Sequence, residues 1–113
     1  MSTITLLDGI DGPPYVGALL RMCLQQVRGR ALAGLDRNFE ALDAFTAALQ
    51  LCRSRGDEAV IYHHMGRLYF GMDNLQQARG AYAMALQIGL PSGLDLQARE
   101  DLKTIDRLLG KER

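Results

Sequence analysis

Hydrophobic residues in the middle of the chain recur with the spacing of two helices joined by a short turn. The first helix has one face whose members follow the i, i+3, i+4, i+7 spacing: Tyr62, Met65, Gly66 and Tyr69. The second has one face of small and aromatic residues at i, i+4 and i+7: Ala78, Tyr82 and Ala85. The sequence Gly71-Met72-Asp73-Asn74 between them contains residue types that end one helix and cap the next. The pattern predicts a helical hairpin.

The N-terminal half shows the same alternation. A first helix is predicted over residues 15–33, with a broad apolar face made of Val16, Leu20, Leu24, Val27 and Ala31. After a turn at residues 34–38, a second helix is predicted over 39–52, with an inner side made of Ala41, Phe45 and Ala48. In the next break, residues 54–57, Gly56 suits a positive φ and Asp57 suits the cap of the following helix.

The two predicted hairpins are related by a shift of 37 residues. The identical pairs fall at turn and helix-contact positions: Gly29/Gly66, Arg30/Arg67, Gly34/Gly71, Asp36/Asp73, Ala41/Ala78, Ala44/Ala81, Ala48/Ala85, Leu49/Leu86 and Gln50/Gln87. A glycine inside a helix costs about 0.5–1 kcal/mol relative to alanine, so two at equivalent places need an offsetting gain. We expect Gly29 to face Ala41 and Gly66 to face Ala78, with Phe45 and Tyr82 beside them.

A further helix is predicted near the C-terminus, over about residues 95–109. Ser92 and Asp95 have the spacing of a capping box, and Gly110 ends the segment. One stripe is apolar: Ala98, Leu102, Ile105 and Leu109. The other face is charged, with Arg99, Glu100, Asp101, Lys103 and Asp106. At the other end, residues 1–14 show no sustained helical face, and we expect an extended arm.

The segment 59–92 resembles a tetratricopeptide repeat in its ordered series of large, glycine, aromatic and alanine positions: Tyr62, Gly66, Tyr69, Ala78, Tyr82 and Ala85. It departs from that pattern at Met65, where leucine is usual, and at Pro91, one place late. The resemblance implies an all-α solenoid of two helical-hairpin repeats, about 16–54 and 59–92, closed by a capping helix. Residues 15–110 would form that one domain, and Gln25 and Arg28 make the first repeat degenerate.

The resemblance also implies a concave groove lined by the first helix of each repeat. Its positions fall on Val60, His63, Arg67 and Phe70 in the second repeat, and on Cys23, Gln26, Arg30 and Ala33 in the first. The steps of three, four and three between the first four residues independently place them on one helix face. Two arginines on one wall suit a carboxylate-bearing peptide. The alternative is that both are solvated or pair with acids of this chain.

Composition limits the other classes of function. The 113 residues carry 13 basic and 13 acidic side chains, so the clustered positive charge of a nucleic-acid binder is missing. No apolar run approaches 18 residues, and we expect no membrane insertion. Cys23 and Cys52 are expected to be buried thiols rather than a disulfide, which favours the cytoplasm as the location.

Catalytic and metal chemistry are not indicated. His63 and His64 are adjacent and therefore on different helix faces, and the residues four places on are Arg67 and Leu68, neither of which is a metal ligand. We expect no enzyme activity, no metal and no cofactor.

The expected function is a protein-interaction module, an adaptor or small chaperone that binds an acidic peptide segment. Two alternatives stay open, a self-assembling structural module and the regulatory domain of a larger complex. Since solenoids usually need three or more repeats, a homodimer or a longer array is expected. The arm, apolar and acidic, is a candidate to lie across the arginine-rich groove of its own chain or of a neighbour.

Overall fold

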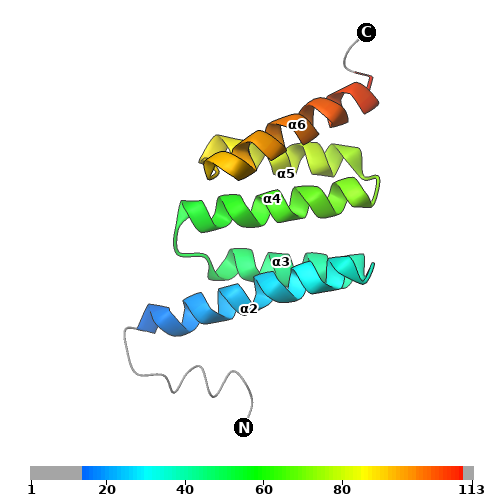
Figure 1. Ribbon diagram of the computed structural model, residues 1–113. Coiled ribbons are helices and arrows are strands. Elements are labelled where there is room, and N and C mark those ends of the chain that lie inside the picture. The colour runs from blue at the N-terminus through cyan, green and yellow to red at the C-terminus, as the bar shows by residue number, and fades with distance from the viewer. Residues whose placement is uncertain (1–13, 111–113) are drawn as a thin grey trace. The chain divides into compact units, whose positions relative to one another are not determined.

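The computed structural model describes residues 14–110 and, within them, contains five α-helices (Figure 1). They are α2 (Pro14–Gly34), α3 (Asn38–Leu51), α4 (Arg55–Gly71), α5 (Leu75–Ile88) and α6 (Ser92–Leu108). The prediction of an all-α chain is confirmed for this range. The expected arm lies outside the described residues, except that Pro14 is the first residue of α2.

The chain divides into two compact units, residues 1–53 and 54–113. The first contains the hairpin of α2 and α3, and the second contains α4, α5 and α6. Between residues 14 and 110, no helix has the length and apolar character needed to span a bilayer.

The turns of the two hairpins have the same geometry, 37 residues apart. Asp36 and Asp73 take the left-handed conformation, with φ of 60° and 62°. The amide of the next residue then bonds back to a carbonyl five residues earlier, Arg37 N to Leu32 O and Asn74 N to Tyr69 O, both at 2.9 Å. This is the Schellman arrangement that closes a helix C-terminus. The left-handed residue is therefore an aspartate, while Gly34 and Gly71 are the last helical residues.

The predicted starts of two helices are wrong by a few residues. The N-cap of α4 is Ser54, whose Oγ accepts a hydrogen bond from the Asp57 amide at 3.1 Å. Gly56 is an ordinary helical residue of the first turn. In α6 the N-cap is Pro91, so Ser92 is already helical and makes no capping hydrogen bond with its side chain. Capping depends on where the backbone leaves the extended region, and residue type alone did not locate that point.

In the first unit, α2 and α3 approach each other closely at Gly29. A Cβ on this glycine would lie 2.7–2.9 Å from three carbons of the Phe45 ring. The Phe45 ring thus covers the glycine directly, whereas the sequence had led us to expect the ring beside it. Small buried residues of α3, Ala41, Ala44 and Ala48, complete this side of the contact.

The second unit repeats the contact with Gly66 and Tyr82. A Cβ at Gly66 would lie 3.0–3.1 Å from the Tyr82 ring. The expected inner residues of α5, Ala78, Tyr82 and Ala85, are all buried. Helix α6 adds its apolar stripe, with Ala98 and Ile105 buried and Leu102 and Leu109 packed against the same cluster. Asp101 and Asp106 are half-buried and bonded to α5, which corrects their expected place on a charged outer face.

The predicted apolar face of α2 is wrong. The residues that α2 buries are Ala18, Met22, Gly29 and Leu32. Leu20, Leu24, Val27 and Ala31, which were expected to form the core, are exposed. The face of α2 that carries Gly29 is buried together with the larger Met22 and Leu32, whereas the row of Leu20, Leu24, Val27 and Ala31 lies on the exposed side.

Candidate interaction surface

The predicted groove of the second repeat is largely closed by packing within its own unit. Of its four residues, only Arg67 is exposed, while Val60 and Phe70 are half-buried and His63 is fully buried. Phe70 packs against the cluster that α5 and α6 form. The prediction of His63 as a groove hydrogen-bond donor is therefore wrong, because a client could not reach its ring.

His63 instead belongs to the interior of the second unit. Its ring meets that of Tyr82 edge-on, with centroids 5.8 Å apart, and lies 5.7 Å from the ring of His64. Neither ring nitrogen makes a hydrogen bond to any residue in the range 14–110. Burial lowers the pKa of His63, the positive charge of Arg67 lowers it further, and Asp101 opposes this. The imidazole is held neutral, which suits packing rather than acid–base chemistry.

Two polar contacts attach α6 to α5 beside this histidine. The Tyr82 hydroxyl donates to the Asp101 carboxylate at 2.8 Å, and Arg79 Nε donates to Asp106 at 2.7 Å. Burial, then the hydrogen bond to Asp101, raises the pKa of Tyr82, so the phenol stays protonated. Asp101 therefore already accepts a hydrogen bond from within the second unit. Arg67, by contrast, has no carboxylate partner among the described residues.

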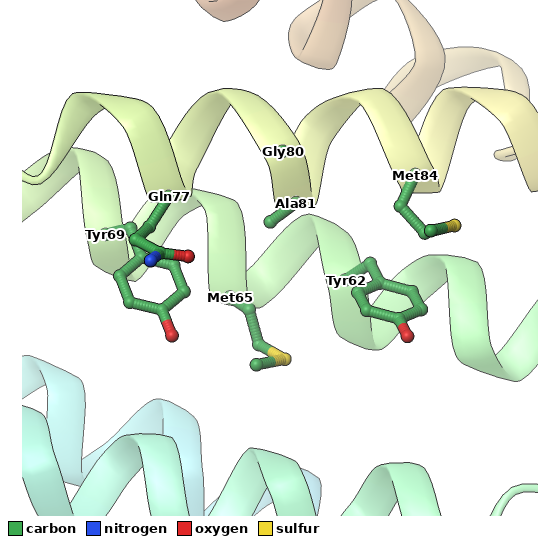
Figure 2. Close-up of a pocket in the computed structure, with 7 residues that line it drawn as sticks. All are labelled: Tyr62, Met65, Tyr69, Gln77, Gly80, Ala81 and Met84. Carbon is green, nitrogen blue, oxygen red and sulfur yellow. The ribbon is translucent and has the colours of Figure 1, made fainter.

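A shallow apolar concavity of about 190 Å³ lies on one side of the hairpin of α4 and α5 (Figure 2). Three residues expected to define the helix-packing face, Tyr62, Met65 and Tyr69, point into it from α4. The α5 side is formed by Gln77, Gly80, Ala81 and Met84. The concavity offers no charged group, and its lining is mostly apolar, with Gln77 and the two tyrosines as its polar residues.

In the first unit, an aligned row of exposed apolar residues lies on α2. We define the α2 stripe as Leu20, Leu24, Val27 and Ala31, which recur at the i, i+4, i+7, i+11 spacing of one helix face. Leu24 is 47% exposed and Val27 is 60% exposed. Single exposed aliphatic residues are common, whereas an aligned row of them marks an interaction surface.

Arginines border this stripe on both sides. With about 100° per residue, Arg28 lies about 100° from Val27 around the helix, and Arg30 lies about 60° from it in the opposite sense. Both are exposed, and neither forms an ion pair with a carboxylate of residues 14–110. Of the other groove residues predicted on α2, Gln26 and Ala33 are half-buried and Cys23 is exposed. The surface therefore combines an apolar centre with uncompensated positive edges.

Comparison with the second repeat shows what this face of α2 is suited to. The residues that a shift of 37 places opposite Leu24 and Ala31 are Ile61 and Leu68. In α4 these are buried, with Ile61 0% and Leu68 7% exposed. Two positions of this face are thus buried in one repeat and exposed in the other, while the counterparts of Leu20 and Val27 are the half-buried Asp57 and His64. The 37-residue repeat relates these positions, but the apolar spacing of α2 had predicted that the stripe would be part of the core.

The thiols also differ from expectation. Cys23 and Cys52 are not joined in a disulfide, and Cys52 is half-buried with its Sγ donating to the Ala48 carbonyl at 3.4 Å. Cys23 is exposed on α2, so the prediction of its burial is wrong. Within residues 14–110, His, Cys, Asp and Glu side chains form no group of three or more placed to hold a metal ion.

Comparisons of the chain with protein-family models, with curated proteins and with solved structures gave no match.

Proposed function

We propose that this chain is a protein-interaction module of the tetratricopeptide type that binds an acidic, partly apolar segment of a partner protein along α2. The observation that carries the proposal is the exposed α2 stripe with Arg28 and Arg30 at its edges, neither of which has a carboxylate partner among residues 14–110. The equivalent turns at Asp36 and Asp73 support the repeat assignment, as do the paired glycine–aromatic contacts. We also propose that the two repeats stack as a solenoid.

The chemistry of the surface determines the partner class. Burial of exposed leucine and valine side chains contributes about 1–2 kcal/mol each, and supplies most of the affinity. Exposed arginine–carboxylate pairs add about 0.2–1 kcal/mol each and select acidic over basic segments. Such a surface binds a peptide weakly, with a dissociation constant in the micromolar range or higher. The affinity falls as the salt concentration rises.

Self-assembly through α2 is the less favoured function. Two α2 stripes placed face to face would bring the arginines of both copies together, and this like-charge contact opposes association. A regulatory domain would use the same surface as an adaptor, with the enzyme or transcription factor as its client.

The test uses a fluorescein-labelled peptide of twelve residues that alternates leucine with aspartate, and a matched peptide that alternates leucine with lysine. Fluorescence anisotropy measures binding of each to the full chain, to Leu24→Glu and to the double variant Arg28→Glu, Arg30→Glu. We expect the acidic peptide to bind the native chain and to bind Leu24→Glu at least tenfold more weakly. The double variant should bind the basic peptide in preference to the acidic one.

Leu108→Glu is the matched control, because Leu108 is 59% exposed on α6 and far from α2 in the sequence. It should bind the acidic peptide like the native chain. Equal binding of the acidic peptide to the native chain and to Leu24→Glu would refute the proposed surface. Circular dichroism on each variant establishes that the helices are retained.

A further inference from the structure

The N-terminal residues have the chemistry that the α2 surface selects. Between Met1 and Pro13 the apolar residues are Ile4, Leu6, Leu7 and Ile10, together with Asp8 and Asp11, and there is no lysine or arginine. We propose that residues 4–11 bind the α2 stripe of their own chain and thereby compete with partner proteins. This inference rests on the proposed function, because it assigns a regulator to the same surface.

The lengths of the two segments are compatible with this contact. At 1.5 Å per helical residue, Leu20 lies about 9 Å and Val27 about 20 Å along the axis from Pro14. In extended chain, at about 3.3 Å per residue, Ile10 can reach about 13 Å from Pro14 and Leu7 about 23 Å. Counted from a reversal at Gly12, Ile10 can reach about 7 Å and Leu7 about 17 Å back along the helix, so the segment can bring Ile10 toward Leu20 and Leu7 toward Leu24.

Charge favours this occupant over a second copy of α2. The carboxylates of Asp8 and Asp11 approach a surface whose edges carry Arg28 and Arg30, neither of which has a carboxylate partner within residues 14–110. An α2 helix from another molecule would instead bring arginine to arginine. The pairing of carboxylates with the arginines at the edges of the α2 stripe also determines the direction in which a short apolar segment lies along the helix.

Covalent connection makes a weak contact sufficient. A segment joined by a few residues has an effective concentration of the order of millimolar. If the free segment has a dissociation constant near 100 μM, the joined segment reduces the affinity for a competing peptide by about tenfold. The segment therefore acts as an intramolecular competitor, and a partner displaces it only when that partner binds more tightly or is present at higher concentration.

The experiment keeps the full chain and changes only the segment, as Leu6→Ser, Leu7→Ser, Ile10→Ser. Two probes are used in anisotropy titrations: the leucine–aspartate peptide, and a labelled synthetic peptide of residues 2–12 of this chain. We expect the triple variant to bind the leucine–aspartate peptide five- to tenfold more tightly than the native chain does. The peptide of residues 2–12 should bind the triple variant, bind the native chain at least fivefold more weakly, and lose binding when Leu24→Glu is added.

Three results would overturn the inference. Unchanged affinity of the triple variant, together with loss of binding in Leu24→Glu, would refute the competitor and leave the proposed function standing. Sedimentation velocity that shows a dimer of the native chain, absent in the triple variant, would mean that the segment binds a neighbouring molecule instead of its own. Failure of Leu24→Glu to affect either probe would instead refute the proposed function, and the inference with it.

Discussion

Replacement of Gly29 by alanine tests the packing that defines the first unit. A methyl group at this position would lie 2.7–2.9 Å from the Phe45 ring, whereas ordinary contacts of a Cβ begin near 3.4 Å. The ring or the helix must therefore move by about 0.5–0.7 Å. Phe45 is 1% exposed and is surrounded by buried alanines, so a shift of this size disturbs the whole contact between α2 and α3.

Two opposing effects set the magnitude. Overpacking of a tight core costs about 1–3 kcal/mol. Alanine in a helix interior is favoured over glycine by about 0.5–1 kcal/mol. The net expectation for Gly29→Ala is a decrease of about 0.5–2 kcal/mol in the free energy of unfolding. Gly66→Ala should decrease it less, because the contact with Tyr82 is looser at 3.0–3.1 Å.

Urea unfolding followed by circular dichroism measures both variants. Gly80→Ala is the matched control, since Gly80 is exposed inside α5 and a Cβ there would meet nothing within 4 Å. It should increase stability by up to about 1 kcal/mol. Gly29→Ala combined with Phe45→Leu should recover part of the loss, because the smaller side chain leaves room for the methyl group. A Gly29→Ala variant as stable as Gly80→Ala would refute the close-contact explanation of the repeated glycine.

Three further changes test other parts of the structure. The pKa of buried His63 is lowered, so the unfolded state takes up a proton more readily than the native state, and the free energy of unfolding should decrease as the pH falls below about 6.5. Urea unfolding at several pH values should show a smaller decrease for His63→Leu than for the native chain. An equal decrease in both would contradict this. Asp36→Gly or Asp73→Gly should raise the melting temperature, because glycine takes the positive φ at about 1 kcal/mol less cost. Ser54→Ala should destabilise by about 1 kcal/mol in urea titrations, since the Asp57 amide loses its cap; no change would contradict the capping role.

The helices and the hairpin turns were predictable because local rules determine them. The spacing of Ala41, Phe45 and Ala48 places them on one face, and all three are buried in α3. The 37-residue period pointed to equivalent turns, and the left-handed residues Asp36 and Asp73 are such a pair. These features depend on short-range spacing and on backbone preference, both of which a single sequence records.

The predicted place of His63 in the groove was wrong because it depends on how helices pack. The ring of Tyr82 on α5 lies 5.8 Å from that of His63, and the sequence of α4 contains no information on how α5 packs against it. The inner face of α2 was misassigned for a similar reason. Leu24 and Val27 are more hydrophobic than Gly29, but the Phe45 ring leaves no room for a Cβ at position 29, so the buried face of α2 is the one that carries this glycine. Hydrophobicity identifies a residue that gains from burial, and only packing decides which residue is buried.

The internal repeat offers a way to separate these two contributions within one chain. Leu24 and Ile61 share a position in the repeat and a similar aliphatic character, yet Ile61 is fully buried and Leu24 is 47% exposed. Intrinsic preference cannot explain the difference, so it reflects whether a neighbouring structure covers that face. A position that is buried in one repeat and remains aliphatic but open in the other is a site that a further element can cover. On α2 that site has arginine edges and follows an acidic, apolar segment of the same chain, which is why we infer both a partner and a competitor for it.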